Sequence, residues 1–235
     1  MEPRLSAVMP VYNESRTLNK VLSLLFYAVP DIYEVVAVDD GSSDNSRDIL
    51  TEYARKDPRL KVFFQQENCG KTAALRTGIA ATSGNVIIIQ DADLEYDPND
   101  INTLLQAFRE RELDAVFGSR FMNWRAHGSR YTQHYLANKT LTFLSNLTNG
   151  LGLTDVETCY KAVRGDLLRA MPINSERFGF EIEVTAYLAK QNAKIVEIPV
   201  SYFGRSYREG KKIGFKDGLM AIGYILKYNL GKRSS

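Results

Sequence analysis

The stretch "IIIQDADLEYDP", residues 87–98, joins a run of isoleucines to a cluster of acidic side chains. Consecutive isoleucines are typical of a strand that is buried on both faces of a sheet. Asp91, Asp93 and Glu95 follow directly, and carboxylates this close together repel one another. The stretch therefore predicts a buried strand that delivers negative charge to a site.

The first half of the chain repeats this arrangement of a short apolar run followed by a helical pattern. Four β–α units in series predict an α/β fold with a mostly parallel sheet and helices on both faces. The expected strands are residues 5–12, 33–42, 60–66, 85–93 and 114–121, and the expected helices are residues 14–28, 44–56, 71–81 and 98–111.

Unusual polar clusters follow four of these strands. They read "PVYNE" (10–14), "DDGSSD" (39–44), "NCGK" (68–71) and "DADLE" (91–95). In open parallel sheets, ligands bind outside the carboxyl ends of the strands. The sequence therefore predicts one site at that edge of the sheet.

The second half of the chain is less regular. Helices are expected at 131–149, 180–191 and 215–229, and strands at 156–163 and 193–202. The sequence contains no internal repeat and no low-complexity linker. We therefore predict a catalytic domain over residues 1–204 and a C-terminal extension over residues 205–235.

The composition is typical of a soluble globular protein, with 44% hydrophobic and 25% charged residues. The N-terminus lacks the apolar run of a signal peptide, and the charge-free stretch 140–154 is too short and polar to span a bilayer. We therefore expect no membrane-spanning segment. Cys69 and Cys159 match no disulfide or metal pattern, which predicts reduced thiols in a cytosolic protein.

The net charge of +2 is unevenly distributed. Residues 205–235 carry eight Lys or Arg and two Asp or Glu, so the other 204 residues sum to −4. A basic tail on an acidic body predicts an anionic partner, such as lipid headgroups, a phosphorylated substrate or nucleic acid. The acidic body and the lack of an interleaved aromatic and basic face argue against nucleic acid.

Asp91 and Asp93 are candidate metal ligands because Mg²⁺ and Mn²⁺ prefer oxygen ligands, typically one or two carboxylates completed by water and phosphate. A solvated turn that merely ends the strand is the alternative. The position of this motif beside the other polar clusters favours metal binding.

Asp40 and Gly41 suit a nucleotide, because a carboxylate accepts from the ring N–H of uracil or guanine and glycine permits close backbone approach. The competing interpretation of this segment is helix capping by Ser42 and Asp44. Lys71 begins a predicted helix and is either a surface charge or a group near phosphate or sugar.

In this order and spacing, "PVYNE", "VDDGSSD", "GK…A…R…G" and "DADLEYDP" resemble a family 2 glycosyltransferase with the nucleotide-diphospho-sugar (GT-A) fold. The resemblance implies a nucleotide pocket along the first strand and at Asp40, and a metal on the Asp91–Asp93 pair with Glu95 as third ligand. The candidate nucleotide-sugar-binding residues are Pro10, Tyr12, Asn13, Glu14, Asp40, Gly41, Lys71, Asp91, Ala92 and Asp93.

The second half resembles the dolichyl- and polyprenyl-phosphate hexose synthases through "GSRF" (118–121), "TDVETCYKAVR" (154–164) and the segments 176–202 and 204–218. This resemblance implies transfer of mannose or glucose, from GDP-mannose or UDP-glucose, to a polyprenyl or dolichyl phosphate, with inversion. Some relatives carry C-terminal transmembrane helices, and from residues 205–235 we expect none here.

A lipid monophosphate is mostly a dianion at neutral pH and attacks without first losing a proton. The site then needs cations to hold two anionic substrates together. Arg120 and Arg205 are the first candidates for a catalytic role, and each basic residue has a solvated surface charge as its alternative. The candidate acceptor-phosphate ligands are Arg120, Arg130, Arg205, Arg208 and Lys211.

For a hydroxyl acceptor, a general base would be required, and Asp155 is the candidate. The alternative role for Asp155 is a turn residue. Glu181 and Glu183 are interpreted as structural residues or sugar contacts. A sugar nucleotidyltransferase is a further alternative function, which release of pyrophosphate would reveal.

The final expected helix carries Phe215, Leu219, Ile222 and Leu226 at helical spacing, with lysines on either side. This pattern is typical of an interfacial helix, although a helix that packs on its own domain gives the same pattern. We therefore predict a cytoplasmic enzyme that is peripheral on the cytoplasmic face of the membrane. The sequence does not identify any membrane-embedded partner.

Overall fold

The computed structural model describes residues 2–122, 132–177, 179–204 and 215–230. Its strands are β1 (Leu5–Val11), β2 (Glu34–Asp39), β3 (Leu60–Phe64), β4 (Val86–Ile89), β5 (Ala115–Ser119), β6 (Lys161–Arg164) and β7 (Ile195–Pro199). Its helices are α1 (Leu18–Ala28), α2 (Ser46–Lys56), α3 (Lys71–Ala80), α4 (Asp100–Glu110), α5 (Thr132–Asn149), α6 (Gly165–Ala170), α7 (Phe180–Lys190) and α8 (Phe215–Leu230).

The seven strands form one sheet in the order β3-β2-β1-β4-β6-β5-β7. All neighbouring strands are parallel except β6, which runs antiparallel to both β4 and β5. β1 lies in the interior, where Val8 is paired with Val36 on one side and with Ile89 on the other. The predicted α/β fold with a mostly parallel sheet is confirmed.

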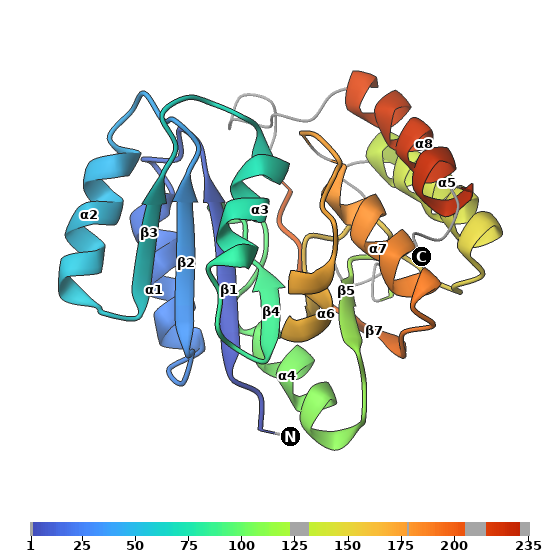
Figure 1. Ribbon diagram of the computed structural model, residues 1–235, viewed down its shortest axis with the longest axis horizontal. Helices are drawn as coiled ribbons and strands as arrows, with labels where there is room; N and C mark the ends of the chain where they lie inside the picture. The colour runs from blue at the N-terminus through green and yellow to red at the C-terminus, as the bar shows by residue number, and fades with distance from the viewer. Residues whose placement is uncertain (1, 123–131, 178, 205–214, 231–235) are drawn as a thin grey trace.

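The sheet is covered on both faces, and nearly every residue of its central strands β1, β2 and β4 is buried. Alternate residues of β2 point to opposite faces. Val35 belongs to the main core with α1, while Val36 and Val38 pack against Ala74 of α3. Figure 1 shows α3 in front of the sheet and α1 behind it.

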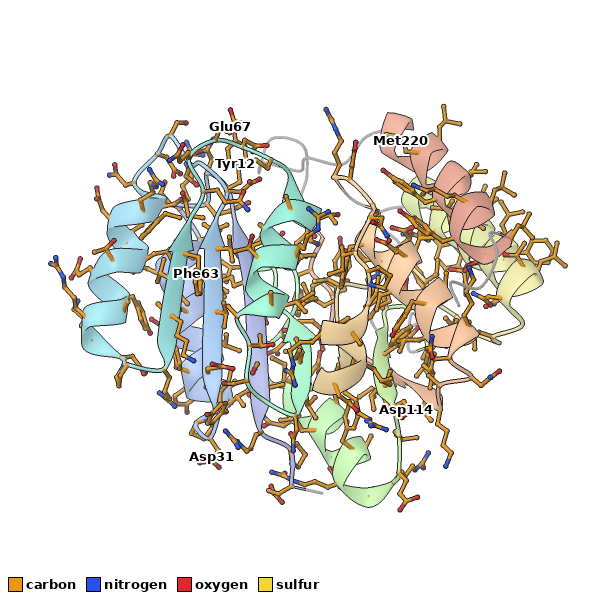
Figure 2. The ribbon with its side chains drawn as sticks, viewed as in Figure 1. Tyr12, Asp31, Phe63, Glu67, Asp114 and Met220 are labelled. Atoms are coloured by element: carbon orange, nitrogen blue, oxygen red, sulfur yellow. The ribbon has the colours of Figure 1, made fainter. Side chains whose placement is uncertain are left out.

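α3 packs closely on the sheet because it carries Gly78 at the contact. A Cβ atom at this position would lie 2.4 Å from Cγ1 of Val8, which is closer than any side chain could tolerate. The close approach holds the first residue of α3 beside the carboxyl ends of the strands. Figure 2 shows Tyr12 and Glu67 at this end of the sheet, and Asp31 and Asp114 at the opposite end.

Two element boundaries differ from the sequence prediction for a visible reason. The helix expected from residue 14 begins at Leu18, because the N–H groups of Glu14 and Ser15 donate to side chains of Ser46, the first residue of α2, and of Asp44 before it. The strand expected from residue 156 begins at Lys161, because residues 155–160 form a buried loop. Helix α6 was not predicted.

Helix α8 packs against α5 and α7 and forms a small second core. Ala221 and Ile225 of α8 are buried against Leu141 and Ile182. Residues 205–214, which begin the predicted C-terminal extension, lie outside the described residues, so the domain boundary at 204 stays a prediction. No helix within the described part of the chain is both long enough and apolar enough to cross a membrane.

Candidate active site

The loops after β1 and β2 are joined by hydrogen bonds that fix the first part of the site. Asn13 has a left-handed backbone conformation, with φ of 52°. Its N–H donates to Ser42 Oγ at 2.9 Å, and its Oδ1 accepts from the Ser43 N–H at 2.8 Å. The predicted residue Asn13 therefore contacts the "DDGSSD" segment, and the Glu14 N–H donates to Ser46 Oγ at the start of α2. Pro10 is partly exposed on β1 and Tyr12 is 36% exposed beside this loop.

Asp40 ties this loop to the segment before α3. Its Oδ1 accepts from the Cys69 N–H at 2.8 Å, and its Oδ2 accepts from the Gly70 N–H at 2.9 Å. Burial raises the pKa of Asp40, against the effect of these hydrogen bonds. Asp40 therefore orders the 69–70 turn, and any contact with a nucleotide base would share oxygens that already accept these bonds.

Gly41 is required by the backbone. Its φ is +69°, a region that residues with a side chain rarely adopt. A Cβ atom here would also lie 2.5 Å from the carbonyl carbon of Glu67. The close backbone approach that was predicted at Gly41 is therefore made by the protein's own chain.

Lys71 lies between two carboxylates that come from distant parts of the chain. Its Nζ is 2.9 Å from Asp91 Oδ1, after β4, and 3.0 Å from Glu181 Oε1, at the start of α7. Burial alone would lower the pKa of Lys71, but the two carboxylates raise it well above its ordinary value. Lys71 is therefore a buried cation of the site and not a surface charge.

Asp93 and Glu95 are held by different contacts in the loop after β4. Asp93 Oδ1 accepts from the Glu95 N–H at 3.1 Å, and Glu95 Oε2 accepts from the Tyr202 hydroxyl at 3.0 Å. Ala92 is buried between the two aspartates, and its carbonyl accepts from Thr17 Oγ1.

The predicted trio does not form a ready-made metal site. Among the described residues, no group of three or more His, Cys, Asp or Glu side chains is placed to hold an ion. The physical reason is that Asp91 pairs with Lys71 while Glu95 is engaged by Tyr202. For Asp91, Asp93 and Glu95 to bind a metal ion together, some of these contacts would have to change.

The chemistry of the site still suits a hard divalent cation. Asp91 and Asp93 supply carboxylate oxygens, and such ions commonly take one or two carboxylates and complete their shell with phosphate and water. Asp91 already holds one cationic group, the ammonium of Lys71, at 2.9 Å. Two carboxylates completed by a ligand's phosphates therefore fit the site, whereas an all-protein cage does not.

Arg120 follows β5 and forms a buried ion pair with Asp155. Its Nε and Nη2 donate to the two carboxylate oxygens at 2.7 and 2.8 Å, and its backbone N–H donates at 3.0 Å. Burial alone would raise the pKa of Asp155, but Arg120 overrides it and lowers this pKa. A fully buried carboxylate in this state is a poor proton acceptor.

The face of the Arg120 guanidinium also contacts an aromatic ring. Its carbon atom lies 5.1 Å from the centre of the Tyr202 ring, which is within the range of a cation–π contact. Because the Tyr202 hydroxyl bonds to Glu95, this tyrosine links Arg120 to the acidic loop after β4. The structure thus brings Arg120, Asp155 and the acidic loop together.

Two further ionisable side chains lie next to this network. Burial, followed by the charge of Glu181, raises the pKa of Glu157 to about 7. Burial lowers the pKa of Lys161 to about 8, and its Nζ donates to the carbonyls of Val156 and Thr158 at 2.8 and 2.6 Å. Lys161 therefore fixes the loop that carries Asp155 and Glu157.

The sequence prediction missed two residues of this network, Tyr202 and Glu197. Tyr202 ends the strand expected at 193–202, so its place at a carboxyl end was a usable signal. Glu197, which accepts from the N–H groups of Thr154 and Asp155, gave no such signal. Glu181 was expected as a structural residue or sugar contact, but its pairing with Lys71, 110 positions away, was not predicted. Glu183 was expected to be either structural or a sugar contact. In the structure it accepts hydrogen bonds from the backbone N–H groups of Asn174 and Ser175, which is a structural role.

Four predicted acceptor ligands lie outside the described residues: Arg130, Arg205, Arg208 and Lys211. Of the five candidate acceptor-phosphate ligands, Arg120 is therefore the one whose position the structure describes. The prediction of unpaired thiols is confirmed, because Cys69 and Cys159 are both free.

Comparison with known families gives a clear match. The model described as "Glycosyl transferase family 2" covers residues 6–171. Undecaprenyl-phosphate mannosyltransferase of Micrococcus luteus is 31% identical over 221 residues, which span 90% of this chain and 88% of the relative. Polyprenol monophosphomannose synthase of Mycolicibacterium smegmatis is 26% identical over 218 residues, which span 90% of this chain and 82% of the relative.

A further relative differs in its sugar. Dodecaprenyl-phosphate galacturonate synthase of Rhizobium johnstonii is 28% identical over 213 residues, with 88% of this chain and 61% of the relative covered. Among solved structures, glucosyl-3-phosphoglycerate synthase from Mycobacterium tuberculosis in complex with uridine diphosphate superimposes with a TM-score of 0.75. It is 19% identical, and 99% of this chain and 82% of that chain are covered, so it shows the fold alone.

Proposed function

The chain belongs to glycosyl transferase family 2, and from this membership we propose that it transfers a hexose from a nucleotide sugar to a polyprenyl phosphate. The relatives named above carry polyprenyl-phosphate mannose or galacturonate activities in their names. We propose mannose or glucose as the hexose, with GDP-mannose or UDP-glucose as donor and Mg²⁺ or Mn²⁺ as cofactor.

The observation that carries this proposal is the state of Arg120 and Asp155. Asp155 is buried and both of its oxygens accept from Arg120, so it is unsuited to remove a proton from an acceptor hydroxyl. A phosphate acceptor needs no base, because it is already mostly dianionic at neutral pH. It needs a fixed cation, and a planar guanidinium suits phosphate oxygens.

In the proposed reaction, Asp155 holds the Arg120 side chain in place and Tyr202 supports the face of its guanidinium. Arg120 orients the acceptor phosphate so that an oxygen attacks the anomeric carbon from the side opposite to the leaving group. A divalent cation held by Asp91 and Asp93 would stabilise charge on the departing nucleoside diphosphate. Inversion at the anomeric carbon follows from a single in-line displacement.

Membrane contact is part of the proposal, and α5 and α8 both support it. Figure 1 shows the two helices side by side. We call their outward apolar side chains the α5–α8 face, and several are largely exposed, including Phe143 at 65% and Leu147 at 72%. The members of the α5–α8 face are Leu136, Phe143, Leu147, Leu219, Met220, Leu226 and Leu230.

The two sequence interpretations of the last helix are therefore compatible. Ala221 and Ile225 pack on the domain, while Leu219 and Leu226 of the predicted stripe point outward. Figure 2 shows Met220 of α8 at the same end of the molecule as Tyr12, the end that carries the candidate site. A bilayer bound to this face would present its lipid phosphates near that end.

The test is an assay of nucleoside diphosphate release with a panel of nucleotide sugars, Mn²⁺ or Mg²⁺, and a polyprenyl phosphate. We expect release only when metal, donor and lipid phosphate are all present. Release with a saccharide acceptor and none with polyprenyl phosphate would favour the hydroxyl-acceptor alternative. Release of pyrophosphate would instead identify a nucleotidyltransferase.

A further inference from the structure

Lys71 forms an ion pair with Asp91, one of the two candidate metal ligands. Its side chain is only 15% exposed, and its ammonium contacts Asp91 at 2.9 Å and Glu181 at 3.0 Å. Glu181 is also buried, and its second oxygen, Oε2, has no hydrogen-bond partner among the described residues. One ammonium therefore neutralises the carboxylate that a divalent cation would need.

The position of Lys71 is fixed by its backbone. It is the first residue of α3, after Gly70 with φ of +91°. The next residue, Thr72, donates from both its N–H and its hydroxyl to the carbonyl of Arg177, at 3.1 and 2.9 Å. The backbone at the start of α3 is thus anchored to the segment before α7. A change of partner by Lys71 would therefore involve its side chain and not its backbone.

We propose that Lys71 holds the place of the divalent cation at Asp91, so that metal binds tightly only together with the nucleotide diphosphate. This inference rests on the proposed function. In the protein without substrates, the Lys71 ammonium lies 2.9 Å from the Asp91 oxygen that a cation would bind, so the two like charges would be close together and would repel. The binding of free metal is therefore opposed.

A nucleotide diphosphate changes this balance in two ways. It brings phosphate oxygens that complete the shell of the metal, which the described carboxylates do not complete alone. It also offers the lysine ammonium new anionic partners, so that Lys71 can release Asp91 while it remains paired. Metal and donor therefore bind as a unit, and Lys71 exchanges Asp91 for phosphate.

The experiment measures Mn²⁺ binding to the full chain by electron paramagnetic resonance, where free Mn²⁺ gives the signal. Titrations are run without nucleotide and with UDP or GDP. Lys71→Gln removes the competing charge, and Lys71→Arg keeps it. Lys61→Gln is the matched control, because Lys61 also forms an ion pair, with Glu34 at 2.6 Å, but at the start of β2 and away from the site.

Without nucleotide, we expect Lys71→Gln to bind Mn²⁺ about tenfold more tightly than the native protein. This is a modest effect for the removal of a positive charge beside the metal ligand. Lys71→Arg and Lys61→Gln should bind as weakly as the native protein. In the native protein, UDP or GDP should tighten Mn²⁺ binding by about tenfold or more, because the nucleotide supplies phosphate ligands and a partner for Lys71.

Two results would overturn the inference while leaving the proposed function intact. One is unchanged or weaker Mn²⁺ binding by a folded Lys71→Gln variant. The other is tight Mn²⁺ binding by the native protein without nucleotide, which is decisive even if Lys71→Gln does not fold. Failure of Mn²⁺ to bind the native protein with either nucleotide would instead count against the proposed function, and the inference would fall with it.

Discussion

Replacement of Asp155 by Asn tests whether this residue positions Arg120 or acts as a base. The native side chain is fully buried and receives three hydrogen bonds from Arg120. Asparagine keeps the shape and one carbonyl acceptor, but it removes the charge and turns an amide donor toward the guanidinium. Loss of one partner of a buried ion pair costs about 3–5 kcal/mol, and the retained acceptor reduces this to about 2–4 kcal/mol.

The stability loss should depend on pH in a defined direction. Because Arg120 lowers the pKa of Asp155, the pair stabilises the fold above the ordinary value of 3.8 and loses this contribution as the pH falls through the lowered pKa. Urea denaturation at pH 7 should therefore show the full deficit of Asp155→Asn. The deficit should shrink toward zero in titrations below about pH 4.

The kinetics separate the two roles more sharply. A positioning role predicts that KM for polyprenyl phosphate rises by about tenfold, with a smaller fall in kcat, because Arg120 is held less firmly. A general base predicts that kcat collapses while KM stays the same. The second result would refute our reading of the pair and favour a hydroxyl acceptor.

A double-mutant cycle with Arg120→Gln provides the control for coupling. If Asp155 acts only through Arg120, the double variant should be about as impaired in KM as either single variant, because the second change removes nothing further. Residues in direct contact usually show an interaction energy of about 0.5–3 kcal/mol in such cycles. Additive effects of the two changes would contradict the positioning role.

Three further predictions concern backbone strain, pH and membrane contact. Gly41→Ala should lower the free energy of unfolding by about 2 kcal/mol or more in urea titrations, because the left-handed backbone is strained by a side chain and the new Cβ clashes with Glu67; unchanged stability would contradict this. The raised pKa of Glu157 means that the folded state retains a proton, so native stability falls as the pH rises from about 4.5 through about 7. Glu157→Gln should remove this loss and gain about 2 kcal/mol over the native protein at pH 8 but not at pH 5; an equal gain at both pH values would disprove the assignment. Phe143→Ser combined with Leu147→Ser should reduce co-sedimentation with anionic vesicles by about tenfold or more at low salt without loss of activity on a short, water-soluble polyprenyl phosphate; undiminished sedimentation would exclude this part of the α5–α8 face as the contact.

The sequence predicted the fold well where strands contain a continuous run of apolar residues. β2 and β4 are buried on both faces, and such runs separated by helical patterns leave few alternatives to a parallel sheet. The edge of the sheet that bears the site followed from the same rule, since carboxyl ends of parallel strands meet at one edge. A strand was expected at 156–163, but nothing in the sequence indicated that β6 runs antiparallel to its neighbours.

The sequence predicted that the loops after β1, β2 and β4 and the segment before α3 lie at one edge of the sheet, but not how their side chains pair. Nothing local to "NCGK" indicates that Lys71 meets Glu181 of α7, because the two residues are 110 positions apart in the sequence. The metal trio shows the same limit. The family resemblance implied Glu95 as the third ligand, whereas in the structure the Tyr202 hydroxyl donates to Glu95.

These pairings answer the question of how so much charge can be held at the end of an apolar strand. Asp91 is neutralised by Lys71, Asp155 by Arg120, and Glu95 is hydrogen-bonded by Tyr202. Buried charges persist only when they are paired, and the site achieves this pairing with its own residues. Under the proposed function, phosphate and metal would therefore bind by replacing these internal contacts. Affinity for the metal would then depend on the nucleotide diphosphate arriving with it, which is what the Lys71 experiment measures.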